Sequence, residues 1–454
     1  VKKMNEPLQG NFEGIGVQFQ MIEDTLLVVQ PVSNGPSEKI GILAGDRIIA
    51  VNDSAIAGVK MSTEEIMKRL RGPKGSKVNL KIVRRGVQDP LVFTVKRDKI
   101  PILSLDASYM IQPKTGYIRI NRFGATTAEE FKKAMKELQK QGMKDMILDL
   151  QGNGGGYLNA AIDLANEFLG QKELIVYTEG RTAKRSDFYA KGNGEFRNGR
   201  LIVLVDEYTA SASEIVSGAV QDWDRGIIVG RRSFGKGLVQ RPIDLPDGSM
   251  IRLTIARYYT PAGRCIQKPY DSSTDYNKDL IERFNHGELM NADSIHFPDS
   301  LKVQTKKLGR TVYGGGGIMP DYFVPIDTTL YTDYHRNLVA KGAVIKFTMK
   351  FIEGHRKELA NKYKKFESFN EKFIIDDDML ATLREMGEKE GVKFNEEQYQ
   401  KSLPLIKTQL KALIARDLWD MNEYFRVMNT TNESVQKALE ILNSEEYQKK
   451  LRVN

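Results

Sequence analysis

Cysteine and histidine are scarce in this sequence. Its 454 residues include one cysteine, Cys265, and four histidines, all of which follow residue 285. A single cysteine excludes an intramolecular disulfide, and the histidines show neither an HExxH pattern nor the spacing of a zinc site. We therefore expect a protein that needs no metal and no organic cofactor.

Long apolar runs are also absent. No stretch approaches the roughly 18 apolar residues of a membrane-spanning helix. Basic residues are mixed with acidic ones, so that the net charge of +9 forms no basic patch. These features argue against a membrane span and against nucleic-acid binding. The length and an apolar content of 41% indicate a globular protein of about two to four domains.

After an N-terminal segment of residues 1–13, residues 14–98 show the pattern of one small mixed domain. Gly14-Ile-Gly-Val precedes a strand, and Ala44-Gly-Asp-Arg-Ile-Ile contains another. Ser62-Thr-Glu-Glu has the capping-box spacing at the start of a short helix. In this order the features resemble a PDZ domain.

The PDZ resemblance implies a peptide-binding site. PDZ domains add the C-terminus of a peptide as a strand, and backbone amides of a glycine-bearing loop hold its carboxylate. In this sequence the loop would run from Phe12 to Gly16. The residues expected to bind the peptide are Gly14, Ile15, Gly16 and Val17.

Strand and helix patterns alternate from residue 99 to residue 327, which indicates an α/β domain with crossover connections. Buried strands are predicted at 146–150, 201–205 and 226–230, and helices at 127–141, 159–169 and 213–222. From residue 328 to residue 454 glycine nearly disappears, and Lys, Glu and Leu follow a helical period. This composition predicts an all-helical C-terminal domain.

Ser211 lies where a buried strand meets a helix, within Thr209-Ala-Ser-Ala-Ser-Glu. Most serines at such a position only cap the helix, and Ser211 and Glu214 have the capping-box spacing. The same position suits a nucleophile, because its alkoxide would face the positive end of the helix dipole. Nearby backbone N–H groups could also bind an oxyanion. This segment alone leaves both interpretations open.

A serine nucleophile needs a base, and no histidine lies in a recognisable triad motif. Lys236 follows the strand at 226–230, so that the carboxyl ends of two parallel strands would bring it close to Ser211. A lysine whose pKa is lowered by burial can accept the serine proton, and Gln240 could orient the amine. An isolated lysine is more often a solvated surface group. The assignment of Lys236 as the base therefore depends on its occurrence together with Ser211 and Gln240.

A glycine-rich loop, Asp149-Leu-Gln-Gly-Asn-Gly-Gly-Gly, joins another strand to a helix. Tyr157 stands where a dinucleotide-binding G-x-G-x-x-G needs glycine, and the absence of a following Gly-Lys-Ser/Thr excludes a P-loop. The loop is better suited to an oxyanion hole. Its donors would be the backbone N–H of Gly154 or Gly155 together with that of Ala212.

Together these motifs resemble the carboxyl-terminal processing (tail-specific) serine proteases of peptidase family S41. The resemblance spans about residues 10–325, and residues 209–215, 234–240, 258–264 and 314–321 carry it with the Asn-x-Gly-Gly loop. It implies that Ser211, Lys236 and Gln240 are catalytic. It also implies a PDZ domain before an α/β core of the ClpP/crotonase-like type, and a place in the bacterial cell envelope, periplasmic or exported.

The sequence departs from the family pattern at several positions. Gln151 stands where the family commonly has arginine, Gly154 where it often has proline, and Arg232-Ser233 where Pro/Lys and Thr are usual. We also expect the helical segment that usually precedes the PDZ domain to be missing. Because the chain begins at Val1 without Met or a signal peptide, it looks like a trimmed product whose missing part could have included a targeting segment.

The sequence thus predicts a serine endopeptidase that cuts polypeptides near their C-termini through an acyl-enzyme, while the PDZ domain recognises the C-terminus. The expected partners are polypeptides with free C-termini, including membrane-associated ones, and the C-terminal helical domain is a candidate homodimer surface. A catalytically silent PDZ scaffold of the same fold is one alternative, disfavoured by the joint presence of Ser211, Lys236 and Gln240. A hydrolase of small thioesters is another, disfavoured by the PDZ domain.

Overall fold

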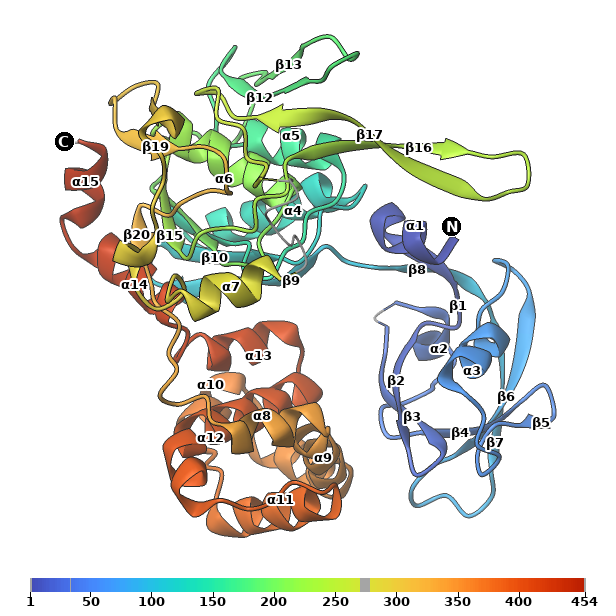
Figure 1. Cartoon of the computed structure of the whole chain (residues 1–454). Coiled ribbons are helices and arrows are strands. Elements are labelled where there is room, and N and C mark those ends of the chain that lie inside the picture. The colour runs from blue at the N-terminus through green and yellow to red at the C-terminus, as the bar shows by residue number, and fades with distance from the viewer. Residues whose placement is uncertain (1, 33, 270–277, 453–454) are drawn as a thin grey trace. The chain divides into compact units, whose positions relative to one another are not determined.

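The computed structural model describes residues 2–32, 34–269 and 278–452 (Figure 1). The chain forms two compact units. Unit 1 contains the residues up to Gln9, Leu103–Thr329 and the residues from Met428 onward, and unit 2 contains Gly10–Ile102 and Leu330–Val427. The predicted segments follow one another along the sequence. Each unit instead collects residues from several segments, because both ends of the chain pack on the α/β core.

The first part of unit 2 is an antiparallel sheet in the order β2-β3-β4-β6-β7, with β5 paired to β4. A separate pair joins β1 to β8. Exposed and buried residues alternate along β6, as expected for a sheet with one face on a core. The elements are β1 (Asn11–Gly14), β2 (Val17–Ile22), β3 (Thr25–Pro31), α2 (Pro36–Lys39), β4 (Arg47–Val51), β5 (Ser54–Ala55), α3 (Thr63–Leu70), β6 (Lys77–Val83), β7 (Leu91–Lys96) and β8 (Asp98–Pro101).

The second part of unit 2 is all-helical, as the sequence predicts. Its helices are α8 (Asp333–Ala340), α9 (Ala343–Lys362), α10 (Phe366–Lys372), α11 (Asp377–Lys389), α12 (Glu396–Leu418) and α13 (Met421–Met428). Side chains cap several of them; for example, Asp376 accepts a hydrogen bond from the backbone of Met379 at the start of α11. Arg47 of the sheet forms an ion pair with Glu353 of α9, so the two parts of unit 2 are in contact.

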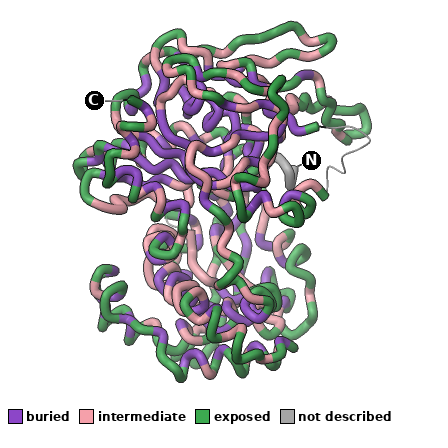
Figure 2. The backbone as a smooth tube through the Cα atoms, turned by 60° about the vertical axis from the view of Figure 1, so that its left-hand side comes forward, coloured by how far each residue is buried: buried purple, intermediate pink, exposed green. Residues whose placement is uncertain are grey.

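Unit 1 is built on a six-stranded sheet in the order β20-β15-β14-β11-β10-β9. Its strands are β9 (Leu105–Gln112), β10 (Thr115–Ile120), β11 (Asp145–Asp149), β14 (Leu201–Val205), β15 (Ile227–Gly230) and β20 (Tyr322–Phe323). All neighbours from β10 to β20 are parallel, and β9 is antiparallel to β10. Every residue of β11, β14 and β15 is buried, which explains why β14 is apolar throughout and why β11 is apolar between its terminal residues Asp145 and Asp149. Figure 2 shows the buried residues of the chain in purple.

Helices and smaller sheets complete unit 1. The helices are α1 (Lys2–Gln9), α4 (Thr127–Lys140), α5 (Leu158–Asn166), α6 (Ala212–Asp222), α7 (Asp279–Asn285), α14 (Glu433–Asn443) and α15 (Glu446–Leu451). A four-stranded sheet, β13-β12-β17-β16, and the pair β18-β19 contain the remaining strands. These are β12 (Leu174–Glu179), β13 (Ser186–Tyr189), β16 (Leu238–Asp244), β17 (Met250–Tyr259), β18 (Lys302–Gln304) and β19 (Thr311–Tyr313). Strands β16 and β17 form a long hairpin (Figure 1).

The predicted fold class is confirmed: a PDZ-type sheet domain, an α/β core and a helical C-terminal region are all present. The expectation of a missing helix before the PDZ domain was wrong, because α1 precedes β1. Within residues 2–32, 34–269 and 278–452, no helix combines the length and apolar character needed to cross a membrane.

Candidate active site

Three loops leave the central sheet of unit 1 at the same edge. The glycine loop (residues 151–156) follows β11, the segment with Ser211 follows β14, and the Lys236 segment (residues 232–237) follows β15. These strands are parallel neighbours, with Asp149 beside Leu204 and Val205 beside Gly230. Carboxyl ends of parallel strands share one edge of a sheet, where α/β proteins usually bind ligands. The order of the strands therefore places the three predicted loops together.

Ser211 has an unusual backbone conformation at the start of α6. Its φ of 58° and ψ of −115° lie outside the regions that side-chain-bearing residues normally occupy. Such a conformation costs about 1–3 kcal/mol and persists only where surrounding contacts impose it. Gly155 supplies one contact, since a Cβ there would lie 2.7 Å from Cβ of Ser211. The half-buried Ser211 is thus held close against the glycine loop.

The carboxylate of Glu214 joins the Ser211 and Lys236 segments. This side chain is completely buried. Oε2 accepts from the backbone N–H of Ser211 and of Lys236, each at 2.8 Å. Oε1 accepts from the Ser233 hydroxyl at 2.5 Å and from the Gly235 N–H at 2.6 Å. Because the first two nitrogens share one oxygen, they lie at most about 5.6 Å apart, twice 2.8 Å.

The pKa of Glu214 depends on its burial and on its hydrogen bonds. Burial raises the pKa of Glu214, and the hydrogen bonds from Ser233, Lys236, Gly235 and Ser211 oppose that rise. From the sequence, Glu214 is predicted only to cap a helix. Its role between two loops was missed, because the 22 residues that separate it from Lys236 carry no pattern that reveals such a contact.

Lys236 and Gln240 lie together along a groove. Lys236 is half-buried, and Gln240 is exposed on β16. Both line a groove of about 960 Å³, to which Leu253, Ile255 and Tyr259 contribute apolar surface. Ser211 is not among the residues that line it. Among the described residues, no hydrogen bond joins the Lys236 amine to the Ser211 hydroxyl or to the Gln240 side chain.

The glycine loop contacts the start of α6 through Asn153. The carbonyl oxygen of this buried residue accepts from Ala210 N at 2.9 Å and from the Ser213 hydroxyl at 3.0 Å. Its amide oxygen accepts from Gly155 N at 2.9 Å, so this N–H is occupied. In the described part of the chain, the backbone N–H groups of Gly154 and Ala212 have no such acceptor. Sequence reasoning missed Asn153, although it belongs to the Asn-x-Gly-Gly motif.

Gln151, one of the predicted departures from the family pattern, forms hydrogen bonds with both Arg119 and Asn432. Arg119 Nη2 donates to its backbone carbonyl at 2.8 Å, and the same guanidinium pairs with the buried Asp149. The Gln151 side-chain oxygen accepts from Asn432 Nδ2 at 3.1 Å. Asn432 also caps α14. A residue near the end of the chain therefore contacts the glycine loop.

The predicted peptide-binding residues lie in unit 2. Gly14 ends β1, Ile15 is buried, Gly16 has a φ of +74°, and Val17 begins β2. The connection between the two strands is therefore shorter than the predicted Phe12–Gly16 loop. Strand β2 is at the edge of its sheet and, among the described strands, pairs only with β3. Its other side offers the backbone groups that an added peptide strand would need.

Three parts of the sequence match known protein families. Sequence models match at residues 114–274 for peptidase family S41, at 14–99 for the PDZ domain and at 334–420 for a family of unknown function. A Staphylococcus aureus protein named "Probable CtpA-like serine protease" is 31% identical over 391 residues, which are 84% of this chain and 74% of that protein. This chain belongs to peptidase family S41.

Other S41 relatives match a smaller part of the chain. The carboxyl-terminal-processing protease of Synechocystis is 39% identical over 266 residues, which are 57% of this chain and 61% of the relative. A solved photosystem II D1 C-terminal processing protease is 28% identical, with a TM-score of 0.36, and the match covers 72% of this chain and 75% of that one. The chain therefore spans less than two thirds of the Synechocystis relative's length.

Proposed function

We propose that this S41 chain is a serine endopeptidase that cuts polypeptides near their C-termini with Ser211 as nucleophile and Lys236 as base. The observation that carries the proposal is the carboxylate of Glu214, which binds the backbone of both residues through one oxygen. A serine that only capped its helix would need neither the strained φ of 58° nor a shared anchor with a lysine segment.

The proposed reaction begins with the Lys236 amine in its neutral form. The amine accepts the proton of the Ser211 hydroxyl, and Oγ attacks the carbonyl carbon of the scissile peptide. The resulting tetrahedral intermediate collapses to an acyl-enzyme as the leaving amine takes the proton. Water, deprotonated by the same lysine, then attacks the ester and releases the acid. Gln240 is assigned to orient the amine.

The reaction needs small adjustments of the structure. The Ser211 hydroxyl and the Lys236 amine must come within hydrogen-bond distance, and such contacts often tighten only when substrate binds. Ala212 and Gly154 have N–H groups available to an oxyanion. Gly155 could take part only after its N–H leaves the amide oxygen of Asn153. We therefore assign the oxyanion hole first to Ala212 and Gly154.

The PDZ domain is proposed to recognise the substrate C-terminus. A peptide strand would add to the open edge of β2, with its carboxylate at Gly14, Ile15, Gly16 and Val17. Half-buried Val17 contributes apolar surface at the start of β2, which suits an apolar terminal side chain. Placement in the bacterial cell envelope and dimerisation through the C-terminal helices stay predictions of the sequence analysis.

Cleavage of an unfolded protein tests the proposal. Casein is incubated with the wild type, Ser211→Ala and Lys236→Ala at near-neutral and alkaline pH, and folding is checked by circular dichroism. We expect cleavage by the wild type and none by either variant. Activity that survives Ser211→Ala contradicts the mechanism. A wild type that is silent even toward peptides with free apolar C-termini, but binds them through β2, would instead indicate the scaffold.

A further inference from the structure

The Lys236 segment has neither helix nor strand of its own. Its position therefore depends on hydrogen bonds to other parts of unit 1. Two of its backbone N–H groups, those of Gly235 and Lys236, donate to the carboxylate of Glu214. Its C=O groups at residues 232 and 233 meet a cation that the proposed mechanism does not use.

That cation is Arg283, which lies on α7. Its Nη2 donates to the carbonyl oxygen of Arg232 at 2.7 Å, and its Nη1 donates to the carbonyl oxygen of Ser233 at 3.2 Å. The side chain is only 4% exposed. A guanidinium holds its donors in a rigid planar fork, so two bonds to successive carbonyls restrict both the position and the direction of the backbone.

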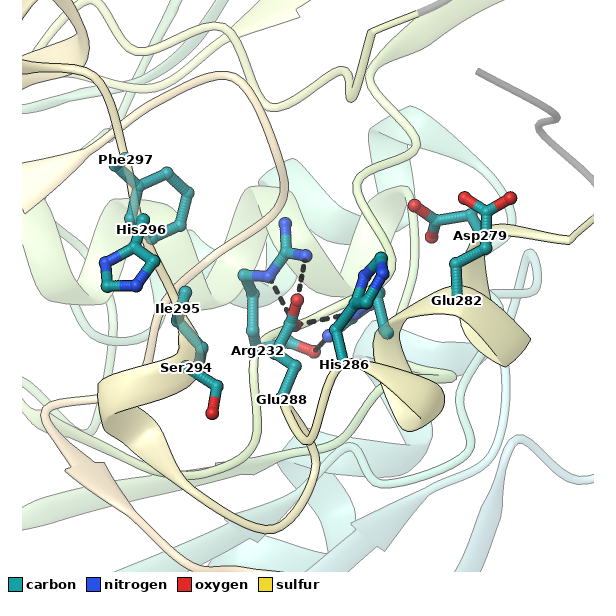
Figure 3. Close-up of a pocket in the computed structure, with 10 residues that line it drawn as sticks. Arg232, Asp279, Glu282, His286, Glu288, Ser294, Ile295, His296 and Phe297 are labelled. Carbon is teal, nitrogen blue, oxygen red and sulfur yellow. Dashed lines mark hydrogen bonds and ion pairs between the residues drawn. The ribbon is translucent and has the colours of Figure 1, made fainter. Parts of the chain in front are cut away.

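Glu288 holds Arg283 in place. Its Oε1 accepts from Arg283 Nε at 2.6 Å, and its two oxygens accept from Arg232 Nε and Nη2 at 2.7 and 2.6 Å. Arg232 also donates to the Gly316 carbonyl at 2.7 Å. The Glu288 carboxylate therefore bridges the two arginines. Figure 3 shows its hydrogen bonds to Arg232. Arg232, one of the departures from the family pattern, thus has a specific partner in Glu288.

The carboxylate of Glu288 stays ionised in this setting. Burial alone would raise its pKa, but the hydrogen bonds and charges of Arg232 and Arg283 lower it on balance. Two cations on one anion leave the cluster with a net positive charge. The cluster therefore needs Glu288 in its ionised form, because the loss of its charge would leave two close arginines without a counter-ion.

We propose that Arg283, oriented by Glu288, is a positioning residue that sets the location of Lys236 relative to Ser211. The inference rests on the proposed Ser211–Lys236 function and adds α7 and the residues up to Glu288 to the active site. Glu214 binds the N–H groups of Gly235 and Lys236, and Arg283 binds the two carbonyl groups that precede them at residues 232 and 233. If either were lost, the segment could shift, and a displacement of about 1 Å can cost on the order of 10²-fold in rate.

The surroundings of the cluster permit a direct test by chemical rescue. Arg232, Arg283 and Glu288 form part of the wall of a pocket of about 270 Å³, which His286 and Phe297 also line (Figure 3). Removal of the Arg283 side chain would extend this pocket toward the two carbonyl groups. A free guanidinium ion could then enter, pair with Glu288 and replace the missing hydrogen bonds.

The experiment uses the full chain and compares Arg283→Ala, Arg283→Lys and a control, Arg310→Ala. Arg310 is also largely buried and paired with two carboxylates, but it binds the carbonyl of Gln221 near the far end of α6, roughly 15 Å from Ser211 at 1.5 Å per residue. The readouts are the rate of Ser211 labelling by a fluorophosphonate and the kcat and KM for a labelled peptide. Unfolding is measured for each variant, so that only folded protein is compared.

We expect Arg283→Ala to slow labelling and kcat by about 10²-fold with little change in KM. Millimolar guanidinium should restore part of the rate in Arg283→Ala and none in Lys236→Ala. Arg283→Lys should retain an intermediate rate, and folded Arg310→Ala should react like the wild type. Guanidinium rescue is the decisive result, because a merely structural defect would not respond to it.

A folded Arg283→Ala that labels at the wild-type rate overturns the inference. If Arg283→Ala does not fold, a wild-type rate in Arg283→Lys or Glu288→Gln overturns it equally. An equal loss in folded Arg310→Ala also overturns it, since the effect would then be general. Labelling that does not depend on Lys236 refutes the proposed function itself, which separates the two failures.

Discussion

Replacement of Glu214 by glutamine tests the central geometry of the site. The carboxylate accepts four hydrogen bonds, one from Ser211 and three from the Lys236 segment, and it is completely buried. In Glu214→Gln an NH₂ group replaces one oxygen, so two of the four donors would face another donor. Each unsatisfied buried donor costs about 1–3 kcal/mol, which gives about 2–6 kcal/mol in all. A typical domain has about 5–15 kcal/mol of stability, so the variant should be weakened but still folded.

The effect on catalysis should exceed the effect on folding. The Ser211 and Lys236 segments would lose their common anchor, and a shift of about 1 Å can lower the rate by about 10²-fold. Glu167→Gln is the matched control, because Glu167 is another buried glutamate of unit 1, paired with Lys132 and bonded to Glu195 N. The control should lose stability but keep its activity when folded. Urea denaturation and initial rates on labelled casein measure the two effects.

The pH dependence separates activity from stability. Burial raises the pKa of Glu214 above its ordinary value of 4.5, so protonation should remove activity at a higher pH than a normal glutamate would. The contribution of Glu214 to folding stability has the opposite pH dependence. It is fully present below the pKa of Glu214 in the unfolded state and is lost as the pH rises through its pKa in the folded state. Glu214→Gln should lack this acidic limb. A folded Glu214→Gln with the wild-type rate and the wild-type pH profile would refute the reasoning.

Substitutions at four further positions test other contacts of unit 1. Gly155→Ala should reduce activity strongly, because its Cβ would collide with Ser211 at a φ of +96°, whereas Gly154→Ala meets no atom within 4 Å and should keep its stability in thermal unfolding. Asn432→Asp keeps the cap of α14 but loses the amide donor to the glycine loop, so its stability in urea should fall by about 0.5–1.5 kcal/mol. The stability of Asn432→Ala should be about 1 kcal/mol lower than that of Asn432→Asp, because the cap of α14 is lost as well. Equal stability of the two variants would contradict the role of Asn432 as a cap. Tyr447→Phe should cost about 1–3 kcal/mol in the same assay, because the buried Leu201 N–H loses its acceptor at 2.9 Å, and an unchanged midpoint would contradict this.

The sequence by itself determined the local elements and the family, and it predicts the reactive groups. Apolar runs predict β14, β15 and the middle of β11, because a strand covered on both faces is mostly apolar. The Ser-x-x-Glu spacing at Ser62 predicts the start of α3, because capping involves residues only three apart. Motifs around Ser211 and Lys236 predict a nucleophile and a base through family resemblance.

Only the tertiary structure decided which groups hold these residues in place. Glu214 reads as a cap in sequence, but its carboxylate reaches a segment 22 residues away. Arg283 contacts carbonyls about 50 residues earlier, and Asn432 contacts a loop 281 residues earlier. Such contacts leave no periodic pattern, because they depend on which strands become neighbours and which loops then share an edge. Local periodicity records the burial of a face, whereas the partner of a buried polar group is set by the fold.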